Sequence, residues 1–156
     1  MLAAALAPAF LGSLPTPARA EATSYLLVVS DDVALAELPL DEVRRVFLLK
    51  RVFWKPGRPI RLVLPATDLP ARAFMLEKVC QKTEGELRRL VIESVYRGDT
   101  DQAPKVAASD DEALKILSTV PGSVALVSVG VALPAHVKAL RIDGKDAGEP
   151  GYPLAR

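Results

Sequence analysis

The stretch LDEVRRVFLLKRVFWKPGRPIRLVLP (residues 40–65) decides the fold, because it holds a helix, a turn and a strand in immediate succession. Apolar side chains in residues 43–47 recur at the i, i+3, i+4 spacing and therefore share one face of a helix. The prolines and the glycine of residues 56–59 end this helix and turn the chain. Residues 60–64 then alternate in the period of a strand.

Strand and helix patterns continue to alternate outside this stretch. Strands are predicted near 25–29, 59–64, 105–108, 123–129 and 137–142, and helices near 71–81, 83–97 and 109–120. Thr83-Glu86 and Ser109-Glu112 are capping boxes that open the last two helices. This alternation predicts an α/β domain, a layered sheet of about five mostly parallel strands with flanking helices. The predicted buried face of helix 83–97 consists of Leu87, Leu90, Val91 and Val95.

The composition limits both size and partners. With 156 residues, half of them hydrophobic, the chain suits a single globular domain. A formal net charge of +1 gives no global attraction to nucleic acid or anionic membranes, so such a preference would need a local patch.

The first twenty residues, MLAAALAPAFLGSLPTPARA, resemble a secretory signal. An apolar run is followed by Ala18-Arg19-Ala20, an A-x-A cleavage pattern, although no basic residue precedes the run. We therefore expect a signal peptide over 1–20, a domain over 21–156, and a periplasmic or secreted location. The alternative is an Ala/Pro-rich tail without structure.

The sequence offers no catalytic constellation and no metal site. Nucleotide-binding glycine loops, HExxH and GxSxG are all absent. Cys80 is the single cysteine and falls in a helical pattern, which favours a buried, inert thiol. His136 is the single histidine and lies far along the chain. The clustered carboxylates near Asp110 sit at a helix start, where capping explains them.

Basic residues of the opening stretch form a candidate docking patch. No acidic residue lies between Glu42 and Asp68, and the patch consists of Arg44, Arg45, Lys50 and Arg51. It would dock an acidic partner, a lipid or nucleic acid, and export together with the near-neutral net charge argues against nucleic acid. The alternative is a solvated face whose Arg and Lys stems cover apolar surface. The interleaved Trp54 is predicted to belong to the core or to a lid over the sheet.

The loop that follows is a candidate anion site. It feeds a helix start, where free N–H groups and the helix dipole favour anions, and it offers Thr67, Asp68 and Arg72. Asp68 is expected to cap that helix, which would occupy the donors and repel an anion. Pro70 removes one N–H.

Several blocks in order resemble the phosphate-binding components of bacterial phosphate ABC transporters. In that family a short helix ending in "IF-G" leads through a Trp to a "G-x-P-I" strand. The matching residues are Val46-Phe47, Trp54, Gly57, Pro59 and Ile60. The resemblance continues in Ala71-Arg72-Ala73-Phe74, residues 106–110, Pro121-Gly122-Ser123-Val124, Ile142-Asp143-Gly144 and Gly151-Tyr152-Pro153-Leu154.

The resemblance implies one lobe of a type 2 periplasmic binding protein, without cofactor or catalysis. It also shows departures. The family's Ser-Gly-Thr-Arg phosphate motif appears here as Leu69-Pro70-Ala71-Arg72, and its Gly-Tyr as Ala125-Leu126. Full members are about twice as long. Two functions follow as hypotheses. One is an exported, non-enzymatic solute-binding module for a small anion such as phosphate. The other is a ligand-free interaction module serving a membrane transporter or sensor protein.

Overall fold

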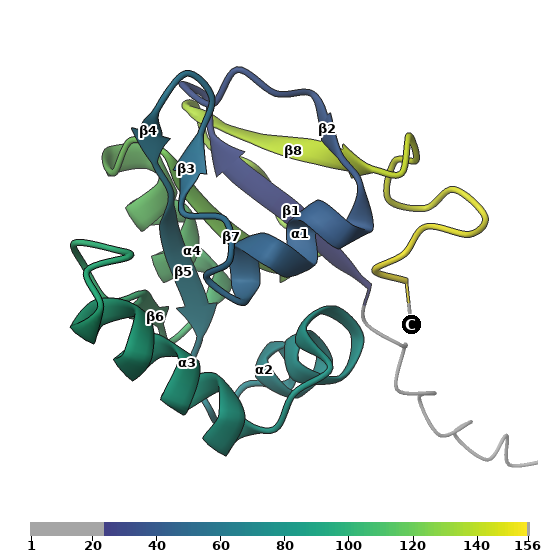
Figure 1. The fold of residues 1–156 in the computed structure, drawn as a ribbon. Helices are drawn as coiled ribbons and strands as arrows, with labels where there is room; N and C mark the ends of the chain where they lie inside the picture. The colour runs from purple at the N-terminus through teal and green to yellow at the C-terminus, as the bar shows by residue number, and fades with distance from the viewer. Residues whose placement is uncertain (1–23, 156) are drawn as a thin grey trace, which may run out of the picture.

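The computed structural model describes residues 24–155 (Figure 1). The predicted signal peptide lies outside these residues. The opening stretch folds as expected into helix α1 (Leu40–Phe47), a turn, and strand β5 (Arg61–Pro65). The turn also contains a small hairpin, β3 (Phe53–Trp54) and β4 (Arg58–Pro59).

The predicted α/β sheet is confirmed, with six strands in the order β2-β8-β1-β7-β5-β6. Five of the strands run in one direction, and β1 alone is antiparallel to both of its neighbours. The extra strand is β2, whose two residues pair with β8 and carry too little pattern to be predicted. The remaining strands are β1 (Tyr25–Ser30), β2 (Glu37–Leu38), β6 (Lys105–Ala107), β7 (Ser123–Ser128) and β8 (Val137–Ile142).

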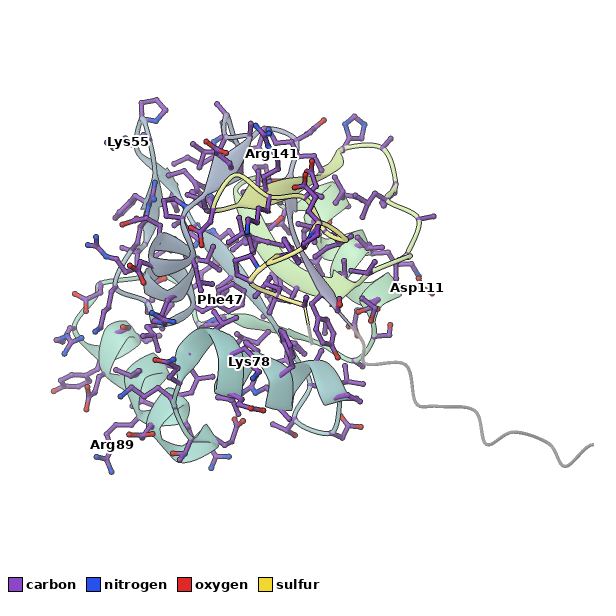
Figure 2. The ribbon with its side chains drawn as sticks, turned by 90° about the vertical axis from the view of Figure 1, so that its right-hand side faces the viewer. Phe47, Lys55, Lys78, Arg89, Asp111 and Arg141 are labelled. Carbon is purple, nitrogen blue, oxygen red and sulfur yellow. The ribbon has the colours of Figure 1, made fainter. Side chains whose placement is uncertain are left out.

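Helices cover both faces of the sheet. Helix α4 (Asp110–Thr119) packs on one face, over the smaller apolar cluster that includes Val28, Val63 and Val127. The larger cluster on the other face gathers side chains from α1, from the helical segment 70–80, and from the tail residues Tyr152 and Leu154. Phe47 from α1 is fully buried in this larger cluster. Its place inside the body can be followed in Figure 2.

The helix predicted over 71–81 differs from expectation in two ways. It is α-helical only over α2 (Pro70–Phe74) and continues as a π-helix, η1 (Met75–Cys80). The prediction that Asp68 caps it is wrong, because Leu69 is the N-cap and no side chain bonds there. Pro70 does occupy the first turn, where its missing N–H costs nothing.

Helix α3 (Glu84–Tyr96) begins at the predicted capping box, in which Thr83 and Glu86 bond reciprocally. Its predicted buried face is only partly right. Leu87 is buried and Leu90 packs against the core, whereas Val95 is 41% exposed. The helix attaches along one narrow side, so its outward side remains free of the core.

Candidate functional site

A pocket of about 310 Å³ lies where three parallel strands end. Strands β5, β6 and β7 end here at Pro65, Ala107 and Ser128, and the helices α2 and α4 begin beside them. In open α/β sheets, ligands bind at this edge, outside the carboxyl ends of the strands. The lining residues are Tyr25, Leu69, Pro70, Ala71, Ala108, Ser109, Asp110 and Ser128. We refer to this space as the strand-end pocket.

Polar groups that line the strand-end pocket bond to one another and to the neighbouring Glu112. The Asp110 carboxylate accepts a hydrogen bond of 3.2 Å from the Ser128 backbone N–H. The Ser109 hydroxyl accepts one from the Glu112 N–H at 3.1 Å, which confirms it as a helix cap. The Glu112 carboxylate accepts from the Ala108 N–H rather than from the Ser109 N–H, so the predicted Ser109-Glu112 capping box is only half formed. These bonds fix the pocket wall and place a negative charge on it.

The candidate ligand residue Arg72 does not face the strand-end pocket. Its guanidinium donates from Nε and Nη2 to both carboxylate oxygens of Glu84, at 2.9 and 2.6 Å, and from Nη1 to the Pro65 carbonyl at 3.0 Å. Arg72 is only 7% exposed. The hydrogen bond from Arg72 holds the pKa of Glu84 below its usual value. Arg72 thus connects the end of β5 to the start of α3. The guanidinium N–H groups that could bind an anion already bind the Glu84 carboxylate.

The other two candidate ligand residues, Thr67 and Asp68, lie exposed in the loop between β5 and α2. Neither side chain makes a hydrogen bond or an ion pair with another residue of the described range. The structure therefore places the three predicted ligand residues in one loop region but does not bring their polar atoms together.

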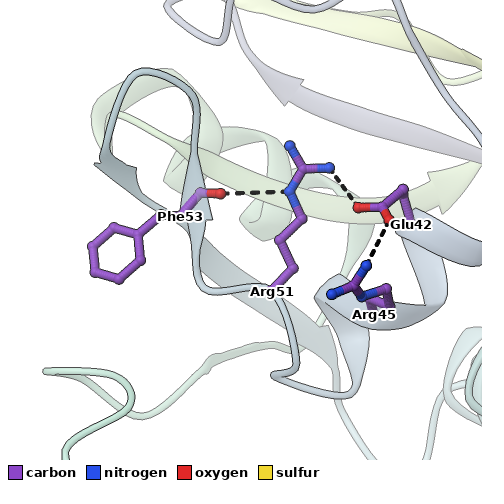
Figure 3. A network of polar contacts seen from close by, with 4 residues as sticks. All are labelled: Glu42, Arg45, Arg51 and Phe53. Carbon is purple, nitrogen blue, oxygen red and sulfur yellow. Dashed lines mark hydrogen bonds and ion pairs between the residues drawn. The ribbon is translucent and has the colours of Figure 1, made fainter.

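The candidate docking patch is largely internally paired. Glu42 accepts from Arg45 at 3.0 Å and from Arg51 at 2.7 Å (Figure 3). These bonds, that from Arg51 foremost, lower the pKa of Glu42. Arg44 pairs with Asp41 and donates from Nε to the Val79 carbonyl. Lys50 is exposed and, among the described residues, has no ion-pair partner.

The predicted core position of Trp54 is confirmed. Its side chain is 2% exposed, and its indole N–H donates to the Gly122 carbonyl at 2.8 Å. The Arg51 guanidinium lies 5.5 Å from the ring centroid, within cation–π range. The Trp54 indole thus adds a side-chain hydrogen bond to the backbone pairing of β5 with β7, which already joins the opening stretch to the chain around Gly122.

The sequence did not predict the roles of two residues that shape these sites. Glu84 is the ion-pair partner of Arg72, and Asp110 lines the strand-end pocket. Both occupy the first helical position, where acidic residues are common because they complement the helix dipole. A capping role therefore masked their long-range bonds. Arg72 and Glu84 lie in two successive helical segments, and nothing in a single sequence indicates that their side chains pair.

The thiol of Cys80 is expected to be inert in the folded protein. It is 1% exposed, and burial raises its pKa to about 11. The thiolate fraction is then about a hundredfold lower than for a free cysteine. A colorimetric thiol reagent at pH 8 should label the native protein at least about a hundredfold more slowly than the urea-unfolded protein. Equal labelling rates would contradict this burial.

Within residues 24–155, no helix has the length and apolar character needed to cross a membrane. The same part of the chain holds no group of three or more His, Cys, Asp or Glu side chains placed to hold a metal ion.

The fold matches solved structures of phosphate-transport proteins. One, from Clostridium perfringens, is described as a phosphate ABC transporter substrate-binding protein with bound phosphate. It aligns at a TM-score of 0.65 and 16% identity, over 80% of this chain and 47% of its own. PstS from Borrelia burgdorferi aligns at 0.66 and 14% identity, over 86% of this chain and 55% of its own. An ABC-type phosphate transport receptor from Vibrio cholerae aligns at 0.62 and 14% identity, over 80% and 48%.

No protein-family model matches the chain, and no curated protein matches it in sequence. At these identities the structural likeness shows the fold alone. It confirms the resemblance that the residues indicated, and it is consistent with a chain that forms one sheet with its flanking helices. The chain has the fold of about half of a phosphate ABC transporter substrate-binding protein, and it spans about half the length of these solved structures.

Proposed function

We propose that this chain is an exported, non-enzymatic solute-binding module, and that it takes a small anion such as phosphate in the strand-end pocket. The main support for this proposal is the position of that pocket. It lies at the carboxyl ends of three parallel strands, between the first residues of two helices. This is the edge at which α/β sheets bind ligands. The Clostridium perfringens neighbour, which was solved with phosphate, supports a small anion as the ligand class.

The residues that would contact the ligand differ from those predicted. Arg72 is held by Glu84, so the polar groups on offer are the hydroxyls of Ser109 and Ser128 and the carboxylate of Asp110. A carboxylate repels a fully ionised anion but accepts a hydrogen bond from one that still carries a proton. The pocket therefore suits hydrogen phosphate better than sulfate. Since one lobe supplies only one wall, we expect weak binding, on the order of millimolar.

Calorimetry with phosphate, sulfate and small carboxylates tests this proposal. Phosphate should give saturable heat, and sulfate should not. Ser128→Ala should weaken phosphate binding, whereas Thr119→Ala, at the opposite end of α4, should leave it unchanged. A folded protein that gives no heat with any anion of the panel would overturn the proposal.

A second candidate function is an interaction module that has kept the fold and lost the ligand. Two observations favour it. The guanidinium of Arg72 is already bonded to Glu84 and Pro65, and Asp110 places a negative charge on the pocket wall. Its partner would be a membrane transporter or a sensor protein that contacts the docking patch. Pull-down from membranes should then succeed with the native chain and fail after charge reversal at Arg45 and Lys50, the two exposed members of the patch. Equal capture by both would rule out this patch.

A further inference from the structure

The outward face of α3 is apolar, although no other described element covers it. Ile92, Val95 and Tyr96 are 61%, 41% and 92% exposed. With 3.6 residues per turn, these three share one face, opposite Leu90, which packs against the core. A contiguous apolar face on a helix of a soluble domain marks an interaction surface. We call it the α3 face.

Two cations stand one turn before this apolar group. Arg88 and Arg89 are exposed, and neither makes a hydrogen bond or an ion pair with another described residue. In Figure 2, Arg89 points away from the body of the molecule. Glu93, on the same flank as Arg89, has only a long contact of 3.9 Å with Arg97. The face therefore carries both an unpaired cation and an available carboxylate.

This arrangement is complementary to itself. When two α3 helices lie antiparallel with Ile92 at the centre, residues before Ile92 in one copy meet residues after it in the other. Arg89 then lies across from Tyr96 and Glu93 of the second copy, which allows a cation–π contact and an ion pair. The stem of Arg88 covers Val95 of the second copy. Each contact occurs twice, as two-fold symmetry requires.

We propose that two copies of this chain pair through the α3 face, antiparallel about a two-fold axis at Ile92. The inference does not depend on the proposed function, because the α3 face lines neither the strand-end pocket nor the docking patch. A helix of 13 residues is about 20 Å long. The interface is therefore at the small end of specific contacts, and a dissociation constant on the order of 10–100 µM is expected.

Sedimentation equilibrium over about 5 to 500 µM protein tests the pairing. The average mass should rise from monomer to dimer over this range. Ile92→Arg should keep the chain monomeric throughout, and Arg89→Glu should weaken pairing at least about tenfold. The double variant Arg89→Glu, Glu93→Arg should restore it, because the ion pair is re-formed with reversed charges. Lys115→Glu, an exposed change on α4, is the matched control and should have no effect.

Cross-linking locates the axis. Since Cys80 is buried, an Ile92→Cys variant presents one reactive thiol, and the two-fold axis places it next to its copy. Mild oxidation should give a disulfide-linked dimer, while Thr119→Cys should not. A chain that stays monomeric to the highest concentration, or equal cross-linking of both variants, would overturn the proposal. Monomers that instead bind vesicles containing phosphatidylglycerol through Ile92 would assign the α3 face to a membrane.

Discussion

Replacing Glu84 by glutamine should lower the free energy of unfolding by about 2–3 kcal/mol. Arg72 is 7% exposed and would keep its charge while losing the carboxylate that receives two of its hydrogen bonds. Removing one member of a buried ion pair costs about 3–5 kcal/mol, and the partial exposure of Glu84 reduces this figure. Urea denaturation of the variant and the native chain measures the difference.

The double variant Arg72→Met, Glu84→Gln separates pairing from packing. It leaves no unpaired buried charge, so it should recover most of the lost stability. Glu77→Gln is the matched control, because Glu77 pairs with Lys78 at the surface and should cost less than about 0.5 kcal/mol. If Glu84→Gln lowered the free energy of unfolding no more than Glu77→Gln does, the ion pair of Arg72 and Glu84 would not contribute to stability.

The same ion pair predicts a pH dependence. Arg72 lowers the pKa of Glu84 in the folded state below the ordinary value of 4.5. Its ionised form therefore stabilises the fold fully above about pH 4.5, and this contribution is lost as the pH falls through the lowered pKa. The stability gap between the native chain and Glu84→Gln should close at acidic pH. A gap of the same size at every pH below 4.5 would contradict this assignment.

The elements that short-range patterns specify were predictable from the sequence. Helix α1 and strand β5 follow from apolar periods within residues 40–65, and both capping residues, Thr83 and Ser109, bond as expected. These features depend on residues at most four positions apart. Their period or spacing is therefore visible in one sequence.

Features that depend on distant partners were not predictable. Arg72 looks like an anion ligand until Glu84 and the Pro65 carbonyl are seen around it. Similarly, α3 has apolar residues on two sides, and only the fold decides that Leu87 is buried while Ile92 and Tyr96 face outward. Periodicity assigns a face to a helix but cannot tell which of two apolar faces meets the core.

Replacing Gly122 by alanine should destabilise the fold by about 4 kcal/mol. The added Cβ would both strain the backbone and clash with a neighbouring backbone atom. Gly122 has a φ of +73°, a conformation that costs a residue with a Cβ about 1–2 kcal/mol. An added Cβ would also lie 2.5 Å from the Pro59 carbonyl oxygen, a backbone atom that cannot rotate away. Relieving this contact would move the Gly122 carbonyl, which accepts the indole N–H of Trp54 and the backbone N–H of Arg61.

Gly98→Ala is the matched control for this substitution. Gly98 has the same φ of +73°, but nothing lies within 4 Å of its added Cβ. It should therefore cost only the conformational part, about 1–2 kcal/mol. The difference between the two variants in urea denaturation isolates the clash and the loosened indole bond. Tryptophan fluorescence gives a second readout, because Trp54 is the single tryptophan of the chain and its buried ring should become more solvated in Gly122→Ala alone. Equal stability of the two variants would show that neither the clash with the Pro59 carbonyl nor the hydrogen bond from Trp54 to Gly122 contributes to the stability of the fold.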